Sequence, residues 1–368
     1  MKSEDLQFMR LALRLARRAY GMTSPNPLVG AVLVKNGKII GRGWHHKAGQ
    51  PHAEIEALNQ AFRLKNNPKG ATLFVTLEPC STHGRTPPCT EAIIKAGIKA
   101  VVIAALDPNP AHAGKALTIL RQAGISVFEG LLAKEALELN EGFNHWIVYR
   151  TPFVVVKAAM SLDGKIATVS GQSKWITGEK ARAYGMWLRQ GSDAILVGVN
   201  TVVHDDPSLT IRSSTPKPLR RIILDPTARL PVEAKVIAGC MDNLTTVVVT
   251  KTAPAKRVAA LKEKVAVLLA PEKNGKIDLA WLLKKLGSES VTRLLVEGGG
   301  ETNALFLLPG LAHRIAFFYA PIIIGGRTAP KGVAGDGIQG LNEAVTLRDV
   351  EWRKLGLDLL LTARVGTP

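Results

Sequence analysis

Short apolar segments with strand character alternate with amphipathic helical segments along the whole chain, and this order most strongly restricts the fold. Residues 29–34 and 38–44 are a predicted hairpin with Asn36-Gly37 as its turn signal. Residues 51–64 predict a helix and 71–79 a buried strand, and further helices and strands alternate up to residue 130. Strands joined through helices are typical of βαβ crossovers. Residues 1–149 therefore predict a layered α/β domain that ends in one helix over 133–149.

The pattern starts again beyond Thr151-Pro152, which marks the predicted domain boundary. An apolar strand opens the segment 153–167, and later segments share its character, at 193–199, 220–225, 245–250, 265–270, 292–296 and 314–324. Helical segments lie between several of them, whereas 347–356 and 357–365 predict an antiparallel hairpin. Continuous apolar runs are typical of parallel strands buried on both faces. Residues 150–368 therefore predict a second, mostly parallel α/β domain, and a chain of this length suits two domains.

The N-terminal segment has Leu6, Met9, Leu13 and Ala16 at helical spacing, which predicts an amphipathic helix packed on a core. Charged residues interrupt it, so we do not expect a secretory signal. No apolar run approaches the roughly 20 residues that span a bilayer, so no membrane partner is expected. With only three cysteines and no export signal, we expect a cytoplasmic protein without a disulfide framework.

The net charge of +18 raises nucleic-acid binding as a hypothesis. The lysines and arginines are scattered, however, and form no run of five or six. No helix-turn-helix, zinc-finger or aromatic RNA-binding pattern accompanies them. We therefore expect a basic surface that attracts small anionic substrates, and no nucleic-acid partner.

Two of the three cysteines, Cys80 and Cys89, lie in the segment EPCSTHGRTPPC at residues 78–89. Such a pair is a disulfide, half of a metal site, or a coincidence. The segment PHAEIEAL offers the missing half, because His52 begins a predicted helix. A catalytic zinc takes three protein ligands and keeps its fourth position open, which His52, Cys80 and Cys89 would satisfy. Cys240 has no histidine or cysteine near it in sequence and is expected to be inert.

Glu54 lies two residues beyond His52 and need not bind the metal. From there it would take a proton from the attacking water and return it to a substrate nitrogen. An H-x-E motif followed by P-C and a second cysteine is the signature of zinc deaminases. The alternative is a solvated helix residue beside an H-x-E that arose by chance. The combination favours the catalytic interpretation.

The segment EGGGETNAL at residues 297–305 combines a strand end, three glycines and a helix start. Glycines let a backbone approach a ligand, and the free amides of a helix start bind anions such as a dinucleotide diphosphate. The alternative is a simple turn. The segment is not G-x-G-x-x-G, so a Rossmann domain is not indicated.

The motifs SPNPLVGAVLV, PHAE, TLEPCSTHGRTPPC, DPNP, KAAMSLDGKIA and QSKWITG resemble, in collinear order, the bifunctional riboflavin-biosynthesis deaminase–reductases. The resemblance covers nearly the whole chain. The ten-residue segment from Cys80 to Cys89 is particular to it, since nucleoside and tRNA deaminases place only two residues between their cysteines.

This resemblance implies a cytidine-deaminase-like three-layer domain at 1–149 and a dihydrofolate-reductase-like α/β domain at 150–368. The first would use Zn²⁺ to deaminate 2,5-diamino-6-(5-phosphoribosylamino)pyrimidin-4-one hydrolytically. The second would use NADPH to reduce the ribosyl group of 5-amino-6-(5-phosphoribosylamino)uracil to ribityl. Such proteins are typically homodimers or tetramers held together through their reductase domains.

Carried over by position, the resemblance makes His52, Cys80 and Cys89 the zinc ligands and Glu54 the proton shuttle. The implied deaminase substrate residues are Asn26, His45, His83, Arg85, Asp107 and Asn109, with Arg85 suited to the phosphate. The implied reductase substrate residues are Ser173, Arg189, Leu209, Arg212 and Glu297. The implied cofactor residues are Ala159, Trp175, Thr201, Asp205, Pro226, Gly299, Gly300, Glu301, Thr302, Asn303, Ala304 and Leu305. One departure is Thr82, where the family usually has histidine; His83 follows it here.

Three alternatives remain open at this stage. A nucleic-acid or nucleoside deaminase with an appended basic binding domain predicts closely spaced cysteines and no dinucleotide site. A binding protein with degenerate sites conflicts with the presence of Glu54. A monofunctional deaminase with a scaffold-only second domain conflicts with the intact EGGGETNAL segment.

Overall fold

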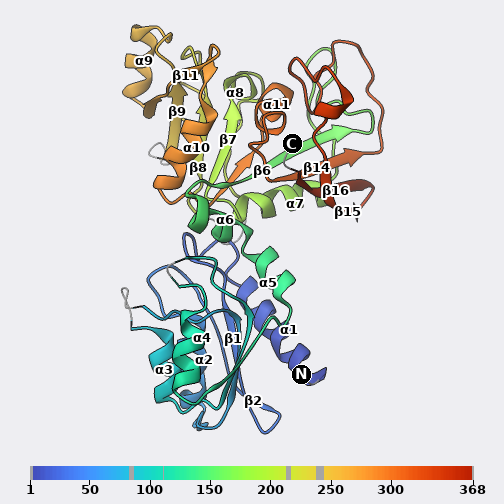
Figure 1. Ribbon diagram of the computed structural model, residues 1–368. Coiled ribbons are helices and arrows are strands. Elements are labelled where there is room, and N and C mark those ends of the chain that lie inside the picture. Colours follow the sequence, from blue (N-terminus) through green and yellow to red (C-terminus); the bar gives the residue numbers. More distant parts are fainter. Residues whose placement is uncertain (1–2, 83–86, 111, 213–216, 238–243, 367–368) are drawn as a thin grey trace. The chain divides into compact units, whose positions relative to one another are not determined.

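The computed structural model describes residues 3–82, 87–110, 112–212, 217–237 and 244–366. The chain divides into two compact units, Met1–Arg150 and Thr151–Pro368 (Figure 1). Each unit has its own sheet and its own hydrophobic core. Among the described residues, no helix is both long enough and apolar enough to cross a membrane.

The first unit is built on a five-stranded sheet with the order β2-β1-β3-β4-β5. Its strands are β1 (Gly30–Lys35), β2 (Lys38–Trp44), β3 (Thr72–Leu77), β4 (Ala100–Ala105) and β5 (Ser126–Glu129). The predicted hairpin is confirmed: Asn36 and Gly37 both take positive φ, 51° and 73°, as the tight turn of a twisted hairpin requires. β3, β4 and β5 pair in parallel, with helices as their crossovers.

Helices cover both faces of this sheet and make the expected three layers. α1 (Ser3–Arg17) and α5 (Ala133–Leu139) pack on one face, where Met9 and Leu13 are buried against Val32 and Phe74. α2 (Ala53–Arg63), α3 (Cys89–Lys95) and α4 (Lys115–Gln122) pack on the other face. A Cβ at Gly43 would collide with the Ala53 backbone, so this glycine lets the start of α2 lie directly against β2.

The single helix expected over 133–149 is wrong, because the chain breaks at Asn140 into α5 and α6 (Glu141–Tyr149). The Asn140 side chain is buried and faces the backbone of Leu28, 112 residues away. Its Oδ1 accepts the Leu28 N–H at 2.7 Å, and its Nδ2 donates to the Leu28 carbonyl at 2.9 Å. These two long-range hydrogen bonds form where the helix is interrupted, and the local spacing of apolar residues could not predict them.

The second unit is built on a nine-stranded sheet with the order β10-β9-β8-β7-β13-β6-β14-β16-β15. All neighbours from β10 to β14 pair in parallel, and β14–β16 and β16–β15 pair antiparallel, which confirms the mostly parallel sheet and the C-terminal hairpin. The strands are β6 (Phe153–Ser161), β7 (Ala194–Gly198), β8 (Arg220–Leu224), β9 (Thr245–Val249), β10 (Ala266–Leu269), β13 (Arg293–Val296), β14 (Arg314–Ala320), β15 (Leu347–Leu355) and β16 (Asp358–Val365). β11 (Glu272–Lys273) and β12 (Lys276–Ile277) form a separate two-stranded sheet.

Alternate residues of each strand face opposite layers of helices. α7 (Glu179–Gln190), α8 (Val199–Asp205) and α9 (Ala255–Lys262) pack on one face, against Val155, Ile195 and Ile223 among others. α10 (Leu279–Ser288) and α11 (Gly300–Leu307) pack on the other, against Val156 and Leu196. Figure 1 shows the helices on both faces of this sheet, with α11 beside the carboxyl end of β7. A parallel sheet covered on both faces explains the continuous apolar runs of its strands.

Candidate functional site

Three side chains of the first unit form a cluster with the geometry of a metal site. His52 is the N-cap of α2, Cys89 is the first residue of α3, and Cys80 follows β3. His52 Nδ1 lies 3.5 Å from Cys80 Sγ and 3.4 Å from Cys89 Sγ, and the ligand atoms all lie within 4.8 Å of one another. A tetrahedral zinc with its usual bond lengths separates a nitrogen and a sulfur ligand by about 3.5 Å. The donor set and the spacing therefore fit zinc.

The surroundings of Cys80 favour the thiolate that a metal ligand needs. Hydrogen bonds from the Cys89 thiol and from His52 lower the pKa of the Cys80 thiol. The backbone N–H of Cys89 also donates to Cys80 Sγ at 3.2 Å. These donors stabilise the charged sulfur, because hydrogen bonds to the charged form of a group favour that form.

Glu54 lies in the first turn of α2 and is only 3% exposed. The alternative of a solvated surface glutamate is therefore wrong. Burial raises the pKa of Glu54 to about 7, and the nearby charge of Cys80 acts in the same direction. A carboxyl group with a pKa near neutral pH, beside these three candidate metal ligands, has the properties of a general acid and base.

Asn26 and His45 lie together on the same side of the first unit as His52. Asn26 Nδ2 and His45 Nε2 are 3.1 Å apart, and His45 Nδ1 is 3.1 Å from the Pro51 carbonyl. With its Nδ1 proton donated to Pro51, His45 accepts from Asn26 through Nε2. The His45 ring meets the His52 ring edge-on at 5.3 Å. His45 is 2% exposed, whereas Asn26 is half-buried.

Asp107 and Asn109 share the loop after β4, where the Asn109 N–H donates to Asp107 Oδ1 at 2.9 Å. Burial raises the pKa of Asp107, and the charge of Cys80 contributes in the same direction, so the two side chains lie within electrostatic reach. Thr82 is exposed. The predicted residues His83 and Arg85, and also Cys240, lie outside the described residues.

The second unit carries a cleft of about 840 Å³ on the face of its sheet covered by α7. Its lining includes the predicted positions Ala159, Trp175, Arg189, Asp205, Leu209, Arg212 and Glu297. Thr201 on α8 and Pro226 follow the ends of β7 and β8, and Glu297 follows the end of β13. The predicted reductase residues thus gather at the carboxyl edge of the parallel strands, where open α/β sheets bind their ligands.

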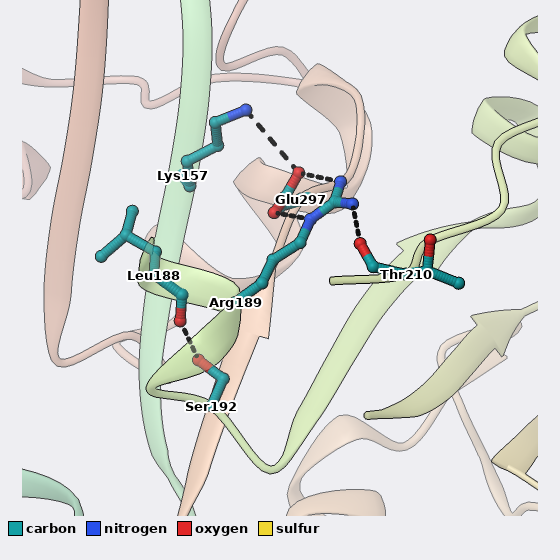
Figure 2. A network of polar contacts seen from close by, with 6 residues as sticks. All are labelled: Lys157, Leu188, Arg189, Ser192, Thr210 and Glu297. Carbon is teal, nitrogen blue, oxygen red and sulfur yellow. Dashed lines mark hydrogen bonds and ion pairs between the residues drawn. The ribbon is translucent and has the colours of Figure 1, made fainter. Parts of the chain in front are cut away.

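Figure 2 shows the polar network in this cleft, centred on Glu297. Arg189 Nε and Nη2 donate to the two Glu297 oxygens, each at 2.9 Å, and Arg189 Nη1 donates to the Thr210 carbonyl at 3.0 Å. Lys157 Nζ lies 3.6 Å from Glu297 Oε2. Burial alone would raise the pKa of Glu297, but the charges of Arg189 and Lys157 lower it to about 2. Glu297 is therefore a carboxylate throughout the physiological range.

Sequence reasoning missed Lys157, which lines the cleft from β6. The signal was present, because Lys157 is the one charged residue in the apolar strand FVVVKAAMS. A charge inside a buried strand is costly unless a partner or a ligand compensates it. Such a residue therefore marks a site.

Direct hydrogen bonds join the loop that carries Ser173 to the end of α8. Ser173 Oγ donates to Asp205 Oδ1 at 2.9 Å, and Lys174 Nζ donates to the Asp205 carbonyl at 3.1 Å. The neighbouring Trp175 ring is 66% exposed, and the Arg182 guanidinium lies 4.8 Å from its centroid. Predicted substrate and cofactor positions therefore belong to one connected rim of the cleft.

The three glycines at the start of α11 are not all required for the same reason. A Cβ at Gly298 would collide with Thr302, and one at Gly300 would collide with the Lys331 carbonyl, so the chain's own packing requires both glycines. Only at Gly299 would a Cβ meet no clash, because its nearest neighbour, Ile166 Cδ1, would lie 4.0 Å away. The interpretation that all three glycines serve ligand approach was too broad.

The remaining predicted cofactor positions lie on α11 itself. Asn303 is fully buried and donates to the Gly332 carbonyl at 2.7 Å, so its side chain points into the protein. Glu301 is exposed and accepts the Gly335 N–H at 3.3 Å. Thr302 and Ala304 are buried, and Leu305 is partly buried. The side chains of Thr302, Asn303 and Ala304 are thus turned away from a cofactor, whereas the backbone groups of the first turn remain candidates for contact.

Known proteins resemble both halves of the chain. Residues 2–105 match the family described as the cytidine and deoxycytidylate deaminase zinc-binding region, and residues 152–361 match the RibD C-terminal domain. The riboflavin biosynthesis protein RibD of Aquifex aeolicus is 48% identical over 97% of each chain. The protein of the same name from Escherichia coli is 38% identical over 97% of this chain and 98% of its own.

Solved structures agree over the same length. RibD of Acinetobacter baumannii superposes with a TM-score of 0.87 at 37% identity, covering 99% of both chains. A diaminohydroxyphosphoribosylaminopyrimidine deaminase/5-amino-6-(5-phosphoribosylamino)uracil reductase from Thermotoga maritima superposes with a TM-score of 0.83 at 34% identity, also over 99% of both. This full-length likeness does not favour the alternative of a nucleic-acid deaminase with an appended basic domain.

Proposed function

Because the chain belongs to the RibD family of bifunctional riboflavin-biosynthesis deaminase–reductases, we propose that its two units catalyse two consecutive reactions on one phosphorylated pyrimidine. The first unit deaminates 2,5-diamino-6-(5-phosphoribosylamino)pyrimidin-4-one. The second reduces the ribosyl group of 5-amino-6-(5-phosphoribosylamino)uracil to ribityl. The enzyme uses zinc for the first step and NADPH for the second. A net charge of +18 attracts such anionic substrates.

The convergence of His52, Cys80 and Cys89 beside the buried Glu54 supports the deaminase assignment. These three residues would hold zinc, which when bound supplies a Lewis acid that activates water for attack on the pyrimidine ring. The Glu54 carboxylate takes the proton of the attacking water and delivers it to the departing nitrogen. Asn26, kept in place by His45, and the loop of Asp107 and Asn109 bind the pyrimidine and ribose. His83 and Arg85 bind the phosphate.

The cleft beneath α7 supports the reductase assignment. NADPH, when bound, supplies the hydride. Gly299 and the first turn of α11 would hold its diphosphate, with Ala159, Trp175, Thr201, Asp205 and Pro226 along the rest of the cofactor. Arg212, exposed at the cleft, binds the substrate phosphate. Ser173, Leu209 and the Arg189–Glu297 pair shape the remainder of the substrate site.

The C-terminal hairpin supports a homo-oligomer formed through the reductase units. β15 is exposed along nearly its whole length and carries Val350 and Trp352, while Leu357 and Leu359 are exposed on the turn and on β16. An exposed edge strand with large apolar side chains is a surface for pairing with another chain. We place the enzyme in the cytoplasm, where a reducing environment keeps both cysteine ligands free.

One experiment tests both activities. The purified protein is incubated with the diaminopyrimidine ribotide, with and without NADPH, and the products are identified by mass. Without NADPH we expect the mass to rise by about one unit, because an oxygen replaces an NH group. With NADPH we expect about two further units, from a hydride and a proton. An unchanged mass in both samples would refute the proposal. A chelator should abolish both mass changes from the diaminopyrimidine ribotide but leave the reduction of supplied 5-amino-6-(5-phosphoribosylamino)uracil intact.

A further inference from the structure

The Glu78 carboxylate has no role in the proposed reaction, yet it is buried and accepts three backbone hydrogen bonds. It follows β3 and is 5% exposed. Its Oε2 accepts the N–H groups of Asp107 at 3.2 Å and Gly114 at 3.0 Å, and its Oε1 accepts the N–H of Ala116 at 3.1 Å. A buried carboxylate is costly unless such donors compensate it. If packing alone were needed here, an apolar side chain would serve without that cost.

All three donors lie in residues 107–116, all but 111 of which the structure describes, between the end of β4 and the first turn of α4. This segment carries Asp107 and Asn109, and the Asn109 N–H closes onto Asp107 Oδ1. The backbone N–H of Glu78 in turn donates to the Ala105 carbonyl at the end of β4, at 2.9 Å. Glu78 therefore binds both the first and the last part of the segment, and it determines how far the segment stands from β3.

The chain around Glu78 also contacts the segment that carries Asn26, on another side of the candidate site. Thr76 Oγ1, within β3, accepts the Gly30 N–H at 3.1 Å and so holds the end of the segment that carries Asn26. Cys80, two residues beyond Glu78, belongs to the metal cluster. Positions 76, 78 and 80 thus hold, in turn, the Asn26 segment, the Asp107 segment and the metal ligand set. Thr76 lies in β3, and Glu78 and Cys80 follow directly after its end, so one short stretch of chain contacts all three.

We propose that Glu78 is a positioning residue of the deaminase. Its carboxylate holds segment 107–116 beside the end of β3, next to Cys80, so that Asp107 and Asn109 contact the substrate. It acts through that segment and does not touch the substrate itself. The inference rests on the proposed deaminase function for its kinetic consequences. The hydrogen bonds themselves do not depend on it.

The variant Glu78→Gln tests the proposal, because an amide keeps the size of the side chain but has one acceptor oxygen for three donors. At least one N–H then faces an NH₂ group. Losing a hydrogen bond to a charged group shifts the equilibrium that holds segment 107–116 in place by about tenfold or more. We expect the KM of deamination to rise about tenfold, with zinc stoichiometry and the reductase reaction unchanged. The control Glu138→Gln, which removes an exposed carboxylate of the same unit, should match wild type.

Two further measurements separate positioning from general damage. Hydrogen exchange at the amides of Asp107, Gly114 and Ala116 should accelerate in Glu78→Gln, a readout that needs no substrate. In an Asn109→Ala background, Glu78→Gln should raise KM less than about twofold, because both changes act on one segment. Unchanged exchange, additive effects on KM, or zinc loss in Glu78→Gln would each overturn the proposal. If wild-type protein fails to deaminate the ribotide, the proposed function fails, and the exchange result alone decides whether Glu78 holds the segment.

Discussion

Arg189 on α7 and Glu297 after β13 form a two-pronged ion pair across 108 residues of sequence, with both N–O distances at 2.9 Å. The third guanidinium nitrogen is also engaged, by the Thr210 carbonyl (Figure 2). Each of the three guanidinium nitrogens of Arg189 thus has a partner within the protein, whereas Arg212 is exposed at the same cleft. This division supports the proposed roles, in which Arg189 positions Glu297 and Arg212 binds the substrate phosphate.

Glu297→Gln should destabilise the second unit by about 3 kcal/mol, because it leaves the mostly buried Arg189 cation without its counter-charge. Denaturant unfolding followed by circular dichroism measures the change in the free energy of unfolding. Glu289→Gln is the matched control, since Glu289 also pairs with two cations but at the surface, and its loss should cost about 1 kcal/mol or less. Equal losses in the two variants would show that burial does not strengthen the Arg189–Glu297 pair.

The same pair predicts a specific acid sensitivity. The pKa of Glu297 falls from an ordinary value of 4.5 to about 2, so the folded state binds its proton more weakly than the unfolded state. The stabilisation is fully present above pH 4.5 and is lost as the pH falls toward 2. Between pH 5 and 2, wild type should lose more stability than Glu297→Gln. Parallel stability curves in acid would contradict a depressed pKa at this site.

Arg212→Ala should raise the reductase KM for the phosphorylated substrate by about tenfold or more, because a charged hydrogen bond to phosphate is lost. The affinity for NADPH, measured by fluorescence titration, should stay near that of wild type. Arg257→Ala, an exposed arginine on α9 away from the cleft lining, is the charge-matched control. Equal weakening of substrate and NADPH would point to a folding defect instead.

Glu54→Gln should retain zinc and the fold while deamination falls by about 10²-fold or more, as expected when a general acid and base is removed. Zinc content by metal analysis and the melting curve provide the structural check. Reduction of supplied 5-amino-6-(5-phosphoribosylamino)uracil should continue at the wild-type rate. Wild-type deamination in this variant would remove Glu54 from the proton transfer.

Whether a feature of the fold or of the candidate sites could be predicted depends on how far apart the interacting residues lie in sequence. His52 and Glu54 could be predicted together, because two residues at a helix start stay close whatever surrounds them. The hairpin at Asn36-Gly37 was equally predictable, since its turn needs only two residues that tolerate positive φ. The break at Asn140 was not, because its cause is the backbone of Leu28. The ion pair of Lys157 with Glu297 was missed for the same reason.

The amino-acid sequence alone predicted the two α/β units, the strands of their two large sheets and most of their helices, because apolar periodicity is set by neighbours within a few residues. It also determined the chemistry of the metal centre, since few residue types ligate zinc and their order matches a known family. Which segments meet in space could be seen only in the folded protein. The sheet order β7-β13-β6 brings Glu297 between Lys157 and Arg189, and the pairing of β3 with β4 brings segment 107–116 to Glu78. Helical crossovers permit many strand orders, and the packing of the whole core selects one of them.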